Sequence, residues 1–184
     1  MAGHAVTIQL RDYQTDLKQR IYAAWHGGAR NVLAVLPCGG GKTAVFSNII
    51  METNCPAVAI AHRAELVAQM SLALARNEVR HRIIGQPETV RAIVHLHTTT
   101  LGVSYFDANA RVAVASVNTL IGKKNLHSWA QSVRLWVTDE AHHFIHGGTW
   151  WKAVEMFPNA IGLGVTATPV RADGKRSEER RVGK

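Results

Sequence analysis

The chain has 184 residues, of which 47% are hydrophobic and 18% are charged, and its formal net charge is +8 at pH 7. This size and composition predict about one globular domain with a real core. Because no apolar run reaches about 18 residues and the N-terminus lacks a signal-peptide pattern, we expect no membrane partner. Two cysteines do not suggest a disulfide scaffold and favour a reducing compartment, the cytoplasm. The positive charge suits either nucleic acid or a merely basic surface.

The first predicted element is an amphipathic helix from Leu10 to about Trp25, because apolar residues recur at helical spacing and two glycines follow. Gln14 lies near its start and carries an amide that donates and accepts hydrogen bonds, which suits the edge of an adenine ring. The string Arg-Asp-Tyr-Gln alone indicates little. It favours a solvated helix start.

The stretch L-P-C-G-G-G-K-T, residues 36–43, separates a predicted buried strand at 31–36 from a helix predicted to begin at Thr43. A glycine run that ends in Lys-Thr between a strand and a helix is the P-loop arrangement. The glycines let successive backbone N–H groups point at one phosphate, and the helix N-terminus adds partial positive charge. The stretch therefore predicts a phosphate site, with a structural turn as the alternative.

Within this loop, Lys42 is positioned to reach the β and γ phosphates, and the hydroxyl of Thr43 to hold Mg²⁺. The general pattern has glycine at the first position, where this chain has Leu36. The match is therefore incomplete at one end.

A second buried strand, 57–61, runs into the start of a helix at His62. Arg63 then lies at the carboxyl edge of the sheet, where open α/β sheets bind ligands. It could hold a nucleic-acid phosphate or pair with a carboxylate. A strand at 79–84 and a helix at 88–97 follow, and residues 98–110 give no clear pattern.

Residues 112–115 predict a fourth strand, and Thr119 lies in the polar stretch that follows it. The small hydroxyl side chains of this stretch could contact a phosphate backbone or cap a helix, and the spacing favours the cap. Residues 133–137 predict a fifth strand, directly followed by Asp139 and Glu140. Asp139 can coordinate Mg²⁺, directly or through water, and Glu140 can orient and deprotonate an attacking water.

A helix is predicted at 150–157 and a sixth strand at 160–165, which ends in Thr-Ala-Thr-Pro. Five or six apolar strands with helices between them predict a mostly parallel α/β sheet covered by helices on both faces.

Six motifs in this order resemble the first RecA-like domain of superfamily-two helicases and translocases, in the DEAH-box group: R-D-Y-Q, P-C-G-G-G-K-T, A-H-R-A-E-L, A-S-V-N-T-L, D-E-A-H and T-A-T-P. The resemblance extends over about residues 8–175 and is greatest to the bacterial and phage branch that also contains restriction-enzyme motor subunits. It implies a RecA-like P-loop NTPase domain at 1–175 that uses ATP and Mg²⁺.

The resemblance also assigns roles. Gln14 would read adenine, and Arg63 and Thr119 would touch the nucleic-acid backbone. The phosphates would be bound by residues of one loop: Gly39, Gly40, Gly41, Lys42 and Thr43. Three residues near the Mg²⁺-triphosphate would be catalytic: Lys42, Asp139 and Glu140. Thr43 and Asp139 would hold the metal. Three further residues would couple hydrolysis to strand movement: His142, Thr166 and Thr168.

The implied function is ATP hydrolysis that drives movement on nucleic acid, with DNA favoured over RNA. A restriction-type translocase of double-stranded DNA and a nucleotide-binding interaction module without motor activity stay open as alternatives. The Asp139–Glu140 pair favours a motor. Helicases of this kind bind ATP between two RecA-like domains, and an arginine finger is worth about 10³ to 10⁵ in the rate of related reactions. No second domain is encoded, so we expect weak nucleotide binding and slight hydrolysis by this chain alone.

Residues 176–184, R-S-E-E-R-R-V-G-K, differ sharply in composition from the preceding segment. They resemble the translation of a sequencing-adapter oligonucleotide. The sequence therefore predicts a non-native or disordered tail on a fragment of a longer protein, with a natural basic tail as the alternative.

Overall fold

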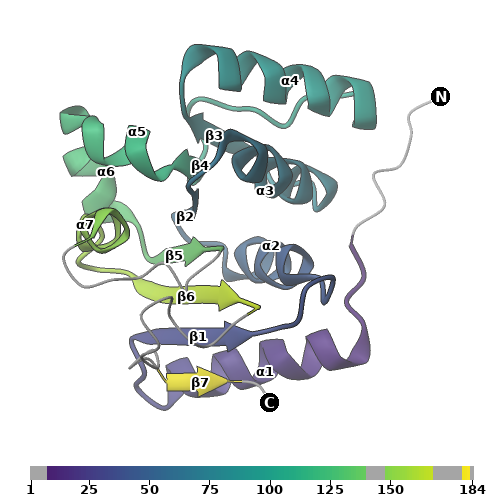
Figure 1. Cartoon of the computed structure of the whole chain (residues 1–184), viewed down its shortest axis with the longest axis vertical. Helices are drawn as coiled ribbons and strands as arrows, with labels where there is room; N and C mark the ends of the chain where they lie inside the picture. The colour runs from purple at the N-terminus through teal and green to yellow at the C-terminus, as the bar shows by residue number, and fades with distance from the viewer. Residues whose placement is uncertain (1–7, 140–147, 168–179, 183–184) are drawn as a thin grey trace.

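The computed structural model describes residues 8–139, 148–167 and 180–182. In this part of the chain, parallel strands form one sheet in the order β3-β4-β2-β5-β6-β1-β7 (Figure 1). The strands are β1 (Asn31–Val35), β2 (Ala57–Ala61), β3 (His81–Ile84), β4 (Val112–Ser116), β5 (Leu135–Thr138), β6 (Ile161–Thr166) and β7 (Arg180–Val182).

Helices connect these strands. They are α1 (Asp12–His26), α2 (Lys42–Thr53), α3 (Ala64–Arg76), α4 (Pro87–Leu101), α5 (Val117–Gly122), α6 (His127–Ser132) and α7 (Thr149–Glu155), with a 3₁₀ turn at Lys124–Leu126. Among the described residues, no helix combines the length and the apolar character needed to cross a membrane.

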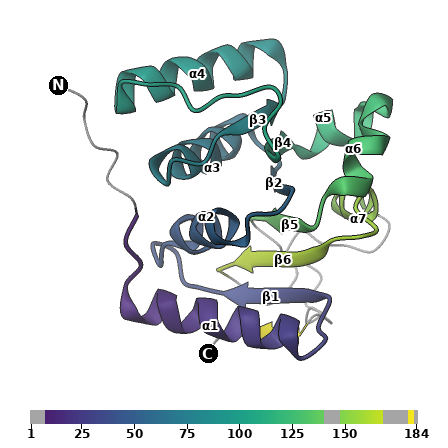
Figure 2. The same cartoon turned by 180° about the vertical axis from the view of Figure 1, so that it is seen from behind.

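The helices cover both faces of the sheet, with α1 to α4 on one face and α5 to α7 on the other. Figures 1 and 2 show α1, α2, α3 and α4 following one another along the molecule, while α5, α6 and α7 gather together. Ile49 and Leu74 belong to the first core, and Leu120 and Trp136 belong to the second. Every residue of β2 is buried, as expected for a central parallel strand between two helical layers. The predicted fold class is confirmed.

The observed boundaries differ from the predicted ones where local hydrogen bonds extend or delay an element. The predicted helix at 88–97 continues to Leu101 and ends at Gly102, whose φ of +76° favours glycine. The predicted strand at 133–137 begins only at Leu135, because the N–H of Val133 still donates to Ala130 at the end of α6 (3.3 Å).

The three described residues of the predicted tail form β7, which pairs with β1 at the edge of the sheet. An edge strand presents unpaired N–H and C=O groups, and an extended segment beside it can satisfy them. The non-native or disordered tail at 176–184 stays a prediction.

Candidate nucleotide site and nucleic-acid edge

The parallel sheet brings the ends of its strands, and so most of the predicted site residues, to one edge. The phosphate loop follows β1, Asp139 follows β5, and Arg63 follows β2 by two positions. Strand β6 lies between β1 and β5. Since neighbouring strands are about 4.8 Å apart, the phosphate loop and Asp139 start from strands about 10 Å apart. The phosphate loop and Asp139 therefore lie at the same edge, on strands with only β6 between them.

The phosphate loop curls as its glycines predict. The N–H of Gly40 donates to the carbonyl of Pro37 (2.9 Å), and the N–H of Leu36 donates to the carbonyl of Thr166 (3.0 Å). Gly39 has φ +75°, and Gly41 has φ +76° as the N-cap of α2. A Cβ on Gly41 would also collide with the amide nitrogen of Gln14. The two positive φ values therefore give the loop the curl at a helix N-terminus that a phosphate-binding loop needs, with Gln14 packed against one side of it.

Gln14 is buried against this loop and is only 4% exposed. Its Nε2 donates to the carbonyl of Gly40 (2.9 Å), and its Oε1 accepts from the N–H of Arg11 (2.9 Å). Arg11, Asp12 and Tyr13 are exposed, as a solvated helix start predicts, but that interpretation is wrong for Gln14, because both ends of its amide are used inside the protein. The hydroxyl of Tyr13 also donates to the Gly40 carbonyl (3.1 Å), a contact that the sequence analysis did not predict.

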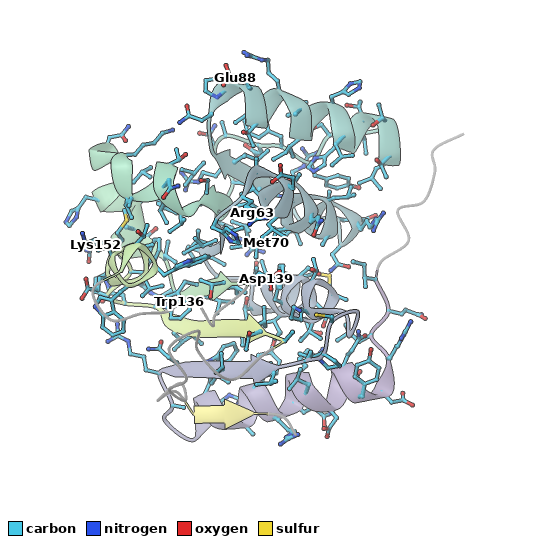
Figure 3. All side chains as sticks on the ribbon, viewed as in Figure 1. Arg63, Met70, Glu88, Trp136, Asp139 and Lys152 are labelled. Atoms are coloured by element: carbon cyan, nitrogen blue, oxygen red, sulfur yellow. The ribbon has the colours of Figure 1, made fainter. Side chains whose placement is uncertain are left out.

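The chemistry of the site suits a magnesium nucleotide. Lys42 and Thr43, the first residues of α2, are both half-buried, as is Asp139 after β5. Asp139 is labelled in Figure 3. Hydroxyl and carboxylate oxygens are ligands of the kind that Mg²⁺ prefers. The N–H groups at the N-terminus of α2, which begins at Lys42, suit a phosphate. Glu140 lies outside the described residues.

Of the three predicted coupling residues, the structure describes Thr166. It is fully buried at the end of β6, the strand between those that lead to the phosphate loop and to Asp139. Through its carbonyl it contacts the first residue of the phosphate loop. His142 and Thr168 lie outside the described residues.

The two predicted nucleic-acid residues lie at the same edge but on the other half of the sheet. Arg63 is exposed at the N-cap of α3. Thr119 is half-buried in the first turn of α5. Their strands β2 and β4 are neighbours, with Ala61 paired to Ser116. Ser116 occupies the N-cap of α5 without a side-chain capping bond, so the favoured capping interpretation is wrong for this residue.

A buried polar chain between α3, β3 and α4 was not predicted. The Oγ of Ser71 lies 2.6 Å from Nε2 of His81 and 3.0 Å from Nε2 of His97. Nδ1 of His81 lies 2.8 Å from the carbonyl of Val79 and therefore carries a proton. Nε2 of His81 then accepts from Ser71, so the neutral ring is satisfied. Burial lowers the pKa of His81 to about 4 and also lowers the pKa of His97.

A parallel sheet with the phosphate loop after β1 and an acidic residue after β5 defines a RecA-like P-loop NTPase domain. The family model "Type III restriction enzyme, res subunit" matches residues 7–171. The chain belongs to this family, and its fold is similar to that of the RecA-like domains of superfamily-two helicases.

Individual proteins that are similar to this chain are named as helicases. A Saccharomyces cerevisiae protein named as an ATP-dependent helicase, IRC3, is 31% identical over 89% of this chain and 24% of its own length. The XPB helicase/translocase subunit of general transcription and DNA repair factor IIH from Antonospora locustae is 25% identical, over 92% of this chain and 24% of its own. The chain thus spans about a quarter of the length of these relatives.

Solved structures show the same fold. UvsW of bacteriophage T4 matches with a TM-score of 0.67 and 16% identity, over 96% of this chain and 34% of that one. The Hef helicase domain of Pyrococcus furiosus matches with a TM-score of 0.59 and 26% identity, over 88% of this chain and 33% of that one.

Proposed function

We propose that this chain binds ATP with Mg²⁺ and, joined to a second RecA-like domain, hydrolyses ATP to drive movement on nucleic acid, with DNA favoured over RNA. The observation that carries the proposal is the common edge. The phosphate loop and Asp139 follow β1 and β5, which are separated only by β6. Such a site has a cradle for phosphates on one side and a carboxylate on the other.

Each residue then has a task that its chemistry permits. The N–H groups of residues 39–43 and the ammonium of Lys42 bind the phosphates. Thr43 and Asp139 would hold Mg²⁺, which when bound offsets negative charge on the triphosphate. Glu140 orients the attacking water and accepts its proton. Gln14 is the proposed adenine contact, and to read the base its amide would exchange one of its hydrogen bonds to Arg11 and Gly40.

The proposed nucleic-acid contacts are Arg63 and Thr119, at the carboxyl ends of neighbouring strands. The net charge of +8 supports a polyanionic partner. DNA is favoured over RNA because the matching family is named after a restriction enzyme, and one relative is named as a subunit of a DNA repair factor. Thr166, together with His142 and Thr168, would carry the nucleotide state to this surface.

A second RecA-like domain is part of the proposal. It would supply the arginine finger, and the relatives have three quarters of their length outside the matched region. The description of the matching family favours a restriction-type double-strand translocase as the second candidate. The two candidates differ in whether strands are separated, which a strand-displacement assay with the full-length protein measures directly.

The Glu140→Gln variant of the full-length protein tests the proposal. Removing the general base should reduce DNA-stimulated ATP turnover by about 10² to 10⁴ while ATP binding is retained. Glu88→Gln on the exposed start of α4 is the matched control, and it should leave turnover unchanged. Equal turnover by Glu140→Gln and the unmodified protein would contradict the catalytic assignment and favour a nucleotide-binding module.

We also propose a cytoplasmic location. Cys38 is exposed within the phosphate loop, and both it and Cys55 are free thiols. A reducing compartment would keep Cys38 from oxidation beside the nucleotide. Cell fractionation with the full-length protein tests this, and recovery from an oxidising compartment would contradict it.

A further inference from the structure

One row of polar side chains on α1 follows α2 along its length. Gln14, Lys18 and Tyr22 recur at every fourth position and therefore lie on the same side of α1. Gln14 contacts the phosphate loop that precedes α2, whereas Lys18 and Tyr22 contact α2 itself. The row thus connects the candidate nucleotide site to the far end of α2.

Lys18 makes the strongest contacts of the row with α2. Its ammonium donates to Oδ1 of Asn48 (2.8 Å) and to Oε1 of Glu52 (2.7 Å), which lie one turn apart on α2. The Lys18 side chain is only 16% exposed, and Asn48 is 8% exposed. Two partners on successive turns fix the position of one ammonium along the helix axis.

Tyr22 continues the row. Its hydroxyl donates to Oε2 of Glu52 (3.2 Å), so the two carboxylate oxygens of Glu52 bind two different side chains of α1. Burial and the neighbouring Glu52 raise the pKa of Tyr22 above its ordinary value, which keeps the hydroxyl protonated as a donor.

The apolar contacts between the helices do not provide the same constraint. Leu17 and Ile21 are buried on α1, and Ile49 and Ile50 are buried on α2. Burial of apolar surface is non-directional, so it holds two helices together without strongly fixing their register. Hydrogen bonds depend on distance and angle, and a shift of one helix along the other breaks them.

We propose that Lys18 is a positioning residue for the nucleotide site. By fixing the register of α1 on α2, it keeps the amide of Gln14 on the carbonyl of Gly40, and so keeps the phosphate loop curled for ATP. The inference rests on the proposed function, because it assigns a task to Lys18 only where the loop binds a nucleotide.

Titration of the whole chain with ATP tests this role. Lys18→Met keeps the apolar stem and removes the ammonium, and it should raise the Kd for ATP about threefold to tenfold. Lys18→Arg keeps a cation and should recover most of the affinity. Arg91→Met is the matched control, because Arg91 is exposed on α4, 3.2 Å from Glu88, and it should leave the Kd unchanged.

A double-mutant cycle separates positioning from general stability. If Lys18 acts through Gln14, Lys18→Met should have no further effect on the ATP Kd in the Gln14→Ala background, although it still lowers the free energy of unfolding. Additive effects on the Kd would overturn the inference. Unchanged ATP affinity in Lys18→Met would overturn it as well and leave the proposed function standing. A chain that binds no ATP at all would contradict the proposed function itself.

Discussion

The two halves of the sheet carry their polar contacts in different places. In the half formed by β1, β5 and β6, polar contacts reach the carboxyl edge itself, where Gln14 binds the carbonyl of Gly40, and continue between α1 and α2 through Lys18. In the half formed by β2, β3 and β4, the buried polar contacts lie between the elements, where Ser71 bridges two histidines. At the edge of this second half, Arg63 is exposed.

This difference suits two kinds of ligand. A loop that side chains already hold in shape loses less conformational freedom when it binds a small nucleotide. A long polyanion needs an open surface instead, and interior polar contacts can stabilise the fold beneath that surface without occupying it. The first half therefore has a preorganised nucleotide site. The second half has an exposed edge above buried polar contacts that stabilise the fold.

Acid should weaken the second half most, and this is the largest effect we expect. The pKa of His81 is about 4 in the folded chain against 6.5 ordinarily, so the unfolded chain binds the proton more readily. The stabilisation is fully present above about pH 6.5 and is lost as the pH falls towards about 4, which amounts to roughly 3 kcal/mol. Urea unfolding at a series of pH values measures it.

The matched variants for this experiment are His81→Gln and His95→Gln. His81→Gln cannot titrate and should flatten the pH dependence of unfolding. His95 is exposed on α4, so His95→Gln should keep the dependence of the unmodified chain. A His81→Gln chain with the same pH profile as the unmodified chain would show that the buried ring is not the titrating group.

Gly41→Ala should damage the first half. Alanine is strained at φ +76°, and its Cβ would collide with the Gln14 amide, so unfolding should become easier by about 1 to 3 kcal/mol and ATP binding should weaken. Thermal unfolding and ATP titration measure the two effects. Gly122→Ala is the control, because open space surrounds Gly122, and it should change neither. Equal behaviour of both variants would argue against a preorganised loop.

Arg63→Ala should have the smallest effect of these substitutions, and it should change only DNA binding at the exposed edge of the second half. Loss of one phosphate contact should weaken binding of DNA irrespective of its sequence and reduce the slope of log affinity against log salt by about 1. Fluorescence anisotropy with the full-length protein and a labelled duplex measures this. Arg76→Ala removes the same charge from the opposite end of α3, and should matter less. A greater loss of DNA affinity with Arg76→Ala than with Arg63→Ala would indicate that nucleic acid binds a different surface of the chain.

Local patterns predicted what depends on local sequence. The apolar run 57–61 became β2 without a change of bounds, because a strand buried on both faces needs apolar residues at every position. The helix that begins at Pro87 was predicted too short, since Thr98 and Thr99 are poor helix formers by propensity. In the structure their hydroxyls donate to the carbonyls of Val94 (2.6 Å) and His95 (3.0 Å) within the helix.

The unpredicted parts of the site depend on pairs of residues far apart in the chain. Lys18 meets Asn48 thirty positions later, and Ser71 meets His97 across two elements. A lysine or serine with a specific partner has the same local sequence pattern as one without a partner. The sequence therefore does not show which residue either of them contacts. The burial of Gln14 is of this kind too, since it depends on the packing of α1 against the phosphate loop.

The most direct test of the account is a crystal structure of the chain with Mg²⁺ and a non-hydrolysable ATP analogue. We expect the β and γ phosphates on the N–H groups of residues 39–43, beside Lys42, and the metal ion bound by Thr43 and, directly or through water, by Asp139. A triphosphate bound elsewhere, or a metal ion out of reach of Asp139, would contradict the claim that these two loops form one site.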